Sequence, residues 1–361
     1  MTCLSSGNAT APGQAAAAAF GQTYRMLLIR RLLLLMALAL LTAGSFLTDL
    51  LTGPSGLDAG AALAGLFSPQ TLSVTERIIL WDIRLPVALM ALAVGGCLGL
   101  AGAETQTALN NPLASPYTLG ISWAATLGAT LTIVFDLAIP GLGPALTLPL
   151  LAFVFAAGAG LLILLLSHSF GSNTETIILF GIALLFSCSA LISLLQFVAD
   201  AEDVQESVLW SLGSLTRASW ESVCSVFATL ILVCGFAMRG VWRMTVLRGG
   251  EEHASSIGLS VHRLRLGALM RASLATAIAV SVVGAIGFVG LVAPHITRML
   301  VGEDHRFYLP GAAIVGAALL SAASILSKLI VPGVVIPVGI VTALVGIPVF
   351  VTLIVLQRRG R

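Results

Sequence analysis

The stretch RGVWRMTVLRGGEEHASSIGLSVHRLRLGALMR, residues 239–271, holds six of the 17 arginines in a chain of 361 residues. Long apolar runs, which are not soluble in water, lie on both sides of it. Basic residues concentrate in the cytoplasmic loops of membrane proteins. We therefore predict that residues 239–271 form a cytoplasmic loop between two spanning helices, long enough to carry a docking surface for a partner.

The composition indicates the class of protein. Soluble domains are roughly 45–50 % apolar and about 25 % charged, whereas this chain is 58 % hydrophobic and 9 % charged, with a mean hydropathy of +1.03. We therefore predict an all-α integral membrane protein. The net charge of +2 is too small to suggest a nucleic-acid partner.

The lysine content excludes one kind of activity. Lys328 is the only lysine and lies between Ser327 and Leu329, whereas a Walker A loop needs the sequence Gly-Lys-Ser/Thr. The chain is therefore not its own P-loop ATPase, and ATP hydrolysis would have to come from a separate subunit. No Cys-x-x-Cys pair occurs, and His295 has no second ligand at metal-binding spacing, so we expect no metal and no cofactor.

About ten apolar segments approach the length of roughly 20 residues that a spanning helix needs. The first covers about residues 32–47 and follows three arginines. A cleaved signal peptide is the alternative interpretation, but the basic residues come late for one. The other segments are 85–106, 118–137, 145–167, 176–199, 222–238, 266–285, a shorter one near 288–300, 309–330 and 337–356.

The charges orient these segments. Ten crossings put both chain ends on one side of the membrane, and that side receives 14 of the 17 arginines. Basic loops stay in the cytoplasm, so we predict cytoplasmic termini, provided that the segment near 288–300 crosses. Residues 1–24 have no charge and no apolar period and are predicted to be a disordered cytoplasmic tail. Residues 25–361 would form the membrane domain.

Three further stretches carry a resemblance to one family. They are IRLPVALMALAVGGCLGLAGAETQTALNNPLASPYTLGIS (residues 83–122), GAIGFVGLVAPHITRMLVGEDHR (residues 284–306) and IPVGIVTALVGIPVFVTLI (residues 336–354). In this order and spacing they resemble FecCD-type permeases, the membrane subunits of bacterial ABC importers for ferric siderophores, haem and vitamin B12. The resemblance extends over residues 25–361.

The resemblance implies a fold and a set of partners. The fold is a type II ABC importer permease-like bundle of about ten transmembrane helices in the bacterial cytoplasmic (inner) membrane. The chain would pair with itself or with a sister permease, two cytoplasmic ATP-binding subunits would drive it, and a periplasmic substrate-binding protein would deliver the cargo. A ferric siderophore is the expected cargo, with haem and cobalamin as alternatives. The chain would be a transport subunit and not an enzyme.

Residues 251–258 of the basic loop read EEHASSIG, with Glu, Ala and Gly spaced as in the ATPase-coupling segment of importer permeases. The acidic residues would begin a short helix, where the helix dipole favours them, and Gly258 suits its C-terminal end. A second helix would follow over 261–266. An ordinary solvated loop is the alternative, and Arg271 would only anchor the topology. By resemblance, the coupling candidates, within about 240–265 and at a second corner, are Glu251, Glu252, Ala254, Gly258, Arg263, Asp304 and Arg306.

The turn Asn110–Pro116 follows the second predicted span and contains two prolines, which prevent a helix from continuing. In the family this turn lies at the cytoplasmic mouth of the translocation path. The resemblance therefore makes Asn111, Pro112 and Leu113 candidates for the gate. A well-made turn with no gating role is the alternative.

Glu104 and Gln106 fall inside the second predicted span, where a carboxylate costs several kcal/mol unless it is paired or hydrated. We expect both side chains to face the aqueous translocation path. A protonated Glu104 in an interhelical hydrogen bond is the alternative. In a proton-coupled secondary transporter, which is the other class of function considered, Glu104 would be the coupling group.

Two basic residues lie near the predicted outer ends of spans. Similar permeases use arginines at this rim to meet carboxylates of the binding protein, and Arg84 and Lys328 occupy such positions. The second arginine that the family usually carries after Leu-Pro is replaced here by Val87. We therefore expect Arg84 and Lys328 to dock the binding protein, with interfacial anchoring as the alternative for Arg84.

Overall fold

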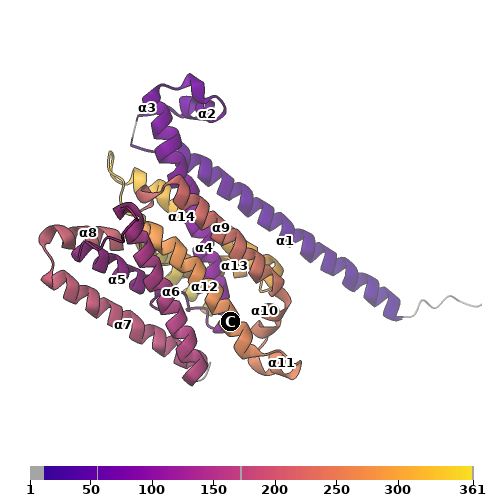
Figure 1. The fold of residues 1–361 in the computed structure, drawn as a ribbon. Helices are drawn as coiled ribbons and strands as arrows, with labels where there is room; N and C mark the ends of the chain where they lie inside the picture. Colours follow the sequence, from indigo (N-terminus) through magenta and orange to yellow (C-terminus); the bar gives the residue numbers. More distant parts are fainter. Residues whose placement is uncertain (1–11, 55, 171–172, 360–361) are drawn as a thin grey trace, which may run out of the picture.

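The structure is a computed structural model that describes residues 12–54, 56–170 and 173–359. Within these residues the chain forms helices and turns and contains no β-strand (Figure 1), which confirms the all-α prediction. The helices are α1 (Pro12–Leu51), α2 (Ala59–Phe67), α3 (Val74–Arg77), α4 (Leu85–Ala108), α5 (Ile121–Val134), α6 (Pro144–Phe170), α7 (Thr174–Val198), α8 (Ala201–Ser211), α9 (Trp220–Arg239), α10 (Val241–Arg248), α11 (Glu251–Ser256), α12 (Val261–Val283), α13 (Val289–Val301), α14 (His305–Leu329) and α15 (Val338–Arg359).

Seven of the described helices are long and apolar enough to cross a membrane, and three shorter apolar helices accompany them. This agrees with the predicted bundle of about ten transmembrane segments. The shorter ones include α5, with 14 residues, and α13, with 13 residues, which is the segment predicted near 288–300. Each rises only about 20 Å, so both must end among protein groups that satisfy their backbone.

The structure corrects two boundaries. Helix α1 begins at Pro12, so residues 12–24 are helical and not a disordered tail; residues 1–11 lie outside the described part. The predicted short helix over 261–266 and the span over 266–285 form one helix, α12, which starts at Val261. Arg263 and Arg265 do not interrupt it, because arginine is a good helix former.

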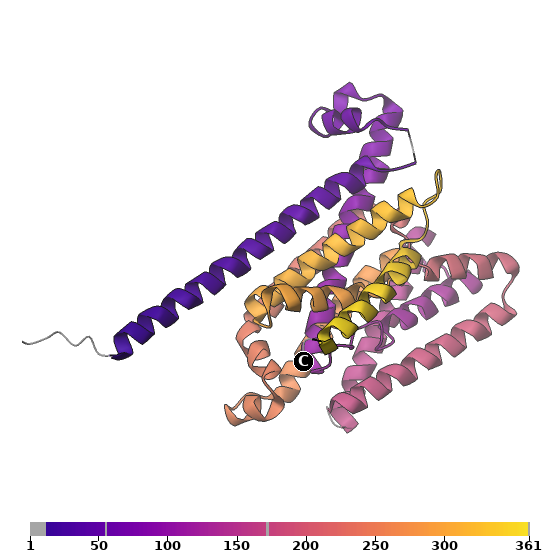
Figure 2. The same cartoon turned by 180° about the vertical axis from the view of Figure 1, so that it is seen from behind.

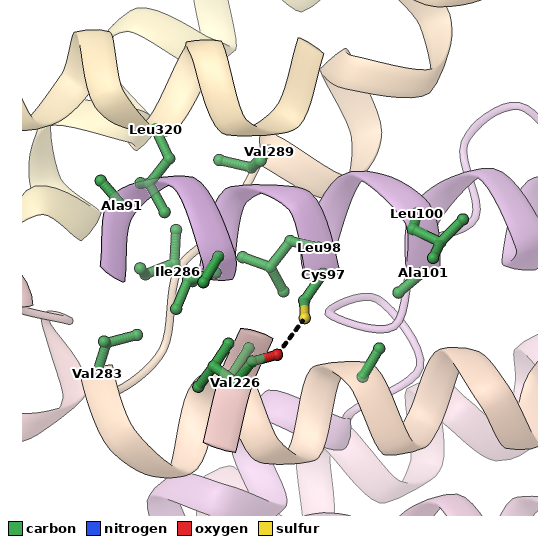
Figure 3. Close-up of a cluster of buried hydrophobic side chains, with 14 of the residues drawn as sticks. Ala91, Cys97, Leu98, Leu100, Ala101, Val226, Val283, Ile286, Val289 and Leu320 are labelled. Atoms are coloured by element: carbon green, nitrogen blue, oxygen red, sulfur yellow. Dashed lines mark hydrogen bonds between the residues drawn. The ribbon is translucent and has the colours of Figure 1, made fainter. Parts of the chain in front are cut away.

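Helix α4 is the centre of the bundle. It packs against α14, α12, α13 and α9, and nearly all of its side chains are buried. Figure 3 shows this contact: side chains of α4 meet Val226 of α9, Val283 of α12 and Leu320 of α14, and the Cys97 thiol lies 3.8 Å from the carbonyl oxygen of Val226. Helix α1, in contrast, lies on the outside of the bundle and packs mainly on α14 (Figures 1 and 2).

Glycines bring α4 into backbone contact with its neighbours. A Cβ atom at Gly95 or Gly99 would overlap backbone atoms of α14, and one at Gly102 would overlap the backbone of Gly290 in α13. Small residues allow this approach in membranes, where no hydrophobic effect drives helices together. The part of α4 from Gly95 to Gly102 is therefore fitted closely to α13 and α14.

The bundle has two chemically different ends (Figure 1). Helices α10 and α11, the start of α12, the first part of the turn after α4 (residues 109–113) and the corner between α13 and α14 (residues 302–305) lie at one end, which we call the basic end. Both described chain ends lie on this side (Figures 1 and 2). Helices α2, α3 and α8 lie at the other end, which we call the acidic end because α8 begins with Asp200, Glu202 and Asp203.

Candidate functional site

Helix α11 projects from the basic end as a single exposed turn. Gly250 and Gly258 flank it with φ angles of +122° and +83°, which residues with a side chain rarely adopt. Of its residues only Ala254 is buried, packed with side chains of α10 and α12. Glu252 and His253 therefore face outward, as a coupling helix requires.

Glu251 differs from its neighbour Glu252 because it faces back into the protein. Its carboxylate forms an ion pair with Arg265 of α12, whose guanidinium is almost completely buried. The Nε of Arg265 donates a 2.8 Å hydrogen bond to the carbonyl oxygen of Ala108, the last residue of α4. One arginine therefore connects α11 to the end of α4.

Arg248, the last residue of α10, makes a second connection of the same kind. Its Nη1 donates to Oδ1 of Asn110 at 2.5 Å, in the turn after α4. Its Nε lies 3.0 Å and its Nη2 2.9 Å from Oε1 of Glu303, in the corner between α13 and α14. Arg248 thus joins three segments that are far apart in the sequence.

His305 joins the same elements from the other side. Its Nε2 lies 2.9 Å from Oγ1 of Thr107 in α4, and its Nδ1 lies 3.2 Å from Oγ1 of Thr245 in α10. The imidazole is buried, so both bonds are shielded from water. The start of α14 therefore also holds α10 against α4.

The structure places Glu104 and Gln106 in the interior of the bundle. Both are fully buried. Arg271 of α12 binds Glu104 with its Nε at 2.9 and 3.1 Å from the two carboxylate oxygens. Arg298 of α13 donates to Gln106 at 3.1 Å, and Gln106 donates to the Leu291 carbonyl oxygen at 3.3 Å. Arg271 is consequently an interior ion-pair partner and not a topology anchor.

Residues 104, 106, 108 and 110 at the end of α4 thus each accept a hydrogen bond from an arginine of another element. The donors, in the same order, are Arg271, Arg298, Arg265 and Arg248. We call these four residues the arginine set. Sequence reasoning missed its role because the partners lie 138 to 192 positions apart.

The gate candidates lie in the turn that Arg248 holds. Asn110 has a φ angle of +44°, a conformation that asparagine tolerates. Oδ1 of Asn111 accepts a hydrogen bond from the Leu113 amide at 2.9 Å, which shapes the turn around Pro112. The Leu113 side chain is 51 % exposed at the basic end. This exposure is compatible with a gate, and the gating role stays a prediction.

Asp304 and Arg306 are engaged inside the protein. The Asp304 side chain caps the start of α14. Its Oδ2 lies 2.7 Å from Nη2 of Arg306 and 3.3 Å from Nη1 of Arg31 in α1. Arg306 stacks over Trp242 of α10 at 4.6 Å. Partial burial would raise the pKa of Asp304, but the hydrogen bonds and charge of Arg306 and the charge of Arg31 outweigh it and lower the pKa. The corner therefore fastens α1, α10 and α14 together.

Arg84 and Lys328, the candidates for docking the binding protein, are engaged inside the protein. Nζ of Lys328 lies 2.7 Å from Oδ1 of the fully buried Asp49, and Arg84 donates to the Leu51 carbonyl oxygen at 3.1 Å. Arg84 is 4 % exposed, and the Lys328 side chain is 6 % exposed. Because α1 ends beside them with a carboxylate and unpaired carbonyl groups, both cations are drawn inward and cannot present their charge to a docking protein in this arrangement.

Among the described residues, no group of three or more His, Cys, Asp or Glu side chains comes together. His295 is mostly buried in α13. The basic end brings an exposed helix, the arginine set and the turn after α4 into contact with one another.

Known proteins are similar to most of this chain. The FecCD transport family matches residues 38–356. The hemin transport system permease protein of Yersinia pestis is 35 % identical over 280 residues, which cover 78 % of this chain and 84 % of that protein. The Fe(3+) dicitrate transport system permease protein FecD of Escherichia coli is 37 % identical over 280 residues, which cover 78 and 86 %.

A solved structure described as a metal-chelate type ABC transporter in an inward-facing conformation has the same fold. Its TM-score is 0.78 at 30 % identity, and the match covers 89 % of this chain and 98 % of that one. The residues that the family matches include α4 and the short helices α5 and α13. The chain belongs to the FecCD transport family and is a multi-pass membrane permease of the ABC transporter type.

Proposed function

We propose that the chain is the transmembrane permease subunit of an ATP-driven importer that carries an iron chelate, a ferric siderophore, across the bacterial cytoplasmic membrane. Relatives named for hemin and ferric dicitrate and a neighbour named for metal chelates support this class of cargo. Haem and cobalamin are the alternative cargoes. A second permease subunit, two cytoplasmic ATP-binding subunits and a periplasmic binding protein would complete the importer.

The observation that carries the coupling role is the two-sided position of α11. Its outer face, with Glu252 and His253, is free to meet a partner, whereas Glu251 on its inner side is bonded through Arg265 to the end of α4. An ATPase that displaces α10 and α11 would therefore move the turn after α4 through Arg265 and Arg248. Glu252, Gly258 and Arg263 would form the contact, and the buried Ala254 would hold α11 against α10 and α12. Asn111, Pro112 and Leu113 would form the gate that moves.

The orientation follows from the same chemistry. The basic end collects the arginines, and the positive-inside bias favours the cytoplasm for it. Both termini would then be cytoplasmic, and the binding protein would meet the acidic end with α2, α3 and α8. Arg77 of α3 is exposed there and offers a cation of the kind that Arg84 and Lys328 do not present.

A proton-coupled transporter receives no support from Glu104. Its two oxygens are bonded to Arg271, and the residue is fully buried, so the carboxylate has no water-accessible oxygen at which to load and release protons. An ATP-driven importer needs an exposed element that contacts its ATPase, and α11 would be that element. A secondary transporter needs no such element.

Transport into vesicles that contain the assembled importer distinguishes the two classes. We expect uptake of a ferric siderophore to need ATP and the ATPase subunit and to continue when an uncoupler removes the proton gradient. Uptake that persists without ATP but collapses with the uncoupler would contradict the proposal.

Co-purification tests the contact on α11. At Gly258 a Cβ atom would meet no neighbour, so only the φ angle of +83° opposes a substitution. Gly258→Ala should therefore weaken ATPase binding, while Gly258→Asn, which tolerates this φ angle, should retain most of it. Deletion of residues 251–258 should release the ATPase. Retention of the ATPase by the deletion variant would assign the docking surface to another part of the basic end.

A further inference from the structure

A pocket of about 730 Å³ lies at the acidic end, where α8 and the starts of α6 and α9 meet the last turns of α12. Its apolar wall includes Phe153 of α6 and Ile278 of α12. Its charged wall consists of Glu206 in α8, Arg217 just before α9 and Glu221 in the first turn of α9. The pocket therefore has charged residues at the acidic end of the bundle and apolar residues further along the spanning helices.

The helices beside the pocket lie at the perimeter of the bundle. Val154 of α6 and Ile231 and Leu232 of α9 are exposed, as apolar side chains that face lipid chains would be. Trp220 at the start of α9 is also exposed, and its Nε1 donates a 3.1 Å hydrogen bond to the Trp81 carbonyl oxygen. Tryptophan is enriched at the boundary between membrane and water. The charged wall of the pocket thus lies at the level of the lipid head groups.

The charges in the pocket do not neutralise one another. Nη2 of Arg217 donates to the Leu209 carbonyl oxygen at 3.3 Å, and the guanidinium lies 5.9 Å from the ring centre of Trp210. Burial lowers the pKa of Arg217, and the nearby charge of Glu206 opposes this effect. Among the described residues, however, neither Arg217 nor Glu206 nor Glu221 takes part in an ion pair. One cation and two carboxylates are therefore left to meet a ligand that carries both signs of charge.

We propose that this pocket binds one phospholipid with an ethanolamine head group, whose phosphate lies on Arg217, whose ammonium group lies at Glu206 and Glu221, and whose acyl chain follows the apolar wall. Arginine suits phosphate because its donors match the phosphate oxygens. A primary ammonium group brings three N–H donors to the carboxylates. A choline head group lacks these donors, and an anionic lipid would place its charge beside two like charges. The bound lipid would join α8 to the starts of α6 and α9, whatever cargo the permease carries.

Native mass spectrometry of the full-length chain in detergent tests the site. Dioleoyl phosphatidylethanolamine, phosphatidylcholine and phosphatidylglycerol would be titrated separately. We expect one tightly retained phosphatidylethanolamine per chain, with a Kd several-fold lower than those of the other two lipids. The same lipid should raise the melting temperature most, because a ligand that binds only the folded state stabilises it. Equal affinity for the three lipids would overturn the inference.

Variants of the charged wall separate the two contacts of the head group. Arg217→Gln should raise the Kd for phosphatidylethanolamine roughly fivefold, the effect of one partly exposed charged hydrogen bond. Arg217→Lys keeps the charge and should retain most of the affinity, which also excludes misfolding as the cause of the loss. The double variant Glu206→Gln/Glu221→Gln should remove the preference over phosphatidylcholine. A preference that survives in the double variant would overturn the role of the carboxylates.

Glu202 of α8 and Arg243 of α10 provide matched controls, since both are exposed and neither lines the pocket. Glu202→Gln and Arg243→Gln should leave the Kd unchanged, and a loss equal to that of Arg217→Gln would overturn the site. Glycerophosphoethanolamine, the head group without acyl chains, should not displace the lipid; displacement at equal concentration would overturn the role of the apolar wall. A dimer that forms in place of the lipid adduct, and is lost in Arg217→Gln, would assign the pocket to a second copy of the chain instead.

Discussion

The two halves of α4 are held in place by different kinds of interaction. From Gly95 to Gly102 the helix is fitted to α13 and α14 by glycines whose backbones touch the facing chains. From Glu104 to the turn after α4 it is held by the arginine set, from α10, α12 and α13. Close steric packing allows one arrangement only, whereas hydrogen bonds from long side chains can follow a displacement. The comparison indicates a fixed part and a movable part within a single helix.

Breaking the buried ion pair of the second half should have the largest effect on stability. Glu104→Ala leaves the guanidinium of Arg271, which is only 20 % exposed, without its partner, and such a loss costs about 3–5 kcal/mol. We expect a lower yield of monodisperse protein and a clearly lower melting temperature. Replacing both partners, Glu104→Gln with Arg271→Gln, should recover part of the loss. A double variant as unstable as Glu104→Ala would argue against the pair as the cause.

The next largest effect on stability is expected when a side chain is added at the glycine contact between α4 and α13. Gly102→Ala places a Cβ atom into the backbone of Gly290 and should cost about 1–3 kcal/mol. The control is Gly158→Ala in α6, where a Cβ atom meets no neighbour; it should be neutral or slightly stabilising. Thermal unfolding in detergent measures both. Equal behaviour of the two variants would remove the distinction between the halves of α4.

Releasing the turn from α10 should affect transport more than stability. Arg248→Gln removes the bonds to Asn110 and Glu303, and partly exposed pairs of this kind contribute about 1 kcal/mol or less. We expect the variant to fold and to bind the ATPase but to show roughly tenfold less transport per ATP hydrolysed, which corresponds to about 1.4 kcal/mol of coupling. Arg243→Gln, on the exposed face of the same helix, is the control and should couple normally.

The smallest effect is expected at the corner between α13 and α14, where Asp304 pairs with Arg31 of α1. The pKa of Asp304 is lowered in the folded protein, so its pairing stabilises the fold above the unfolded carboxyl pKa of about 3.9 and is lost as the pH falls through the folded value. Asp304→Asn should therefore lower stability by at most about 1 kcal/mol near neutral pH. The difference from the unaltered chain should shrink as the pH falls below about 4. A constant difference over this range would mean that the charge of Asp304 is not involved.

The short helix at the basic end could be predicted from the sequence, but not all of the contacts that surround it. The exposed turn over 251–256, the buried Ala254 and the glycine at Gly258 agree with the predicted short helix. Arg248 and Glu303 were not predicted to be site residues, although Arg248 lies in the basic loop 239–271 and Glu303 in the stretch 284–306 that resembles the family. Nothing in either stretch indicates that Arg248 would reach Asn110, because the two are separated by 138 positions.

The sequence by itself determined that the chain is a helical membrane protein, approximately where its apolar segments lie, and which end carries the positive charge. These properties are local, since each segment partitions into lipid according to its own side chains. Only the tertiary structure decided whether a polar residue faces water or a partner. Glu104 and Lys328, which the sequence suggested to be accessible, are buried in ion pairs, and Arg84 is buried against backbone carbonyl groups. A charge in a membrane bundle goes where an opposite charge or a free carbonyl group can reach it, and that is a property of the packed fold.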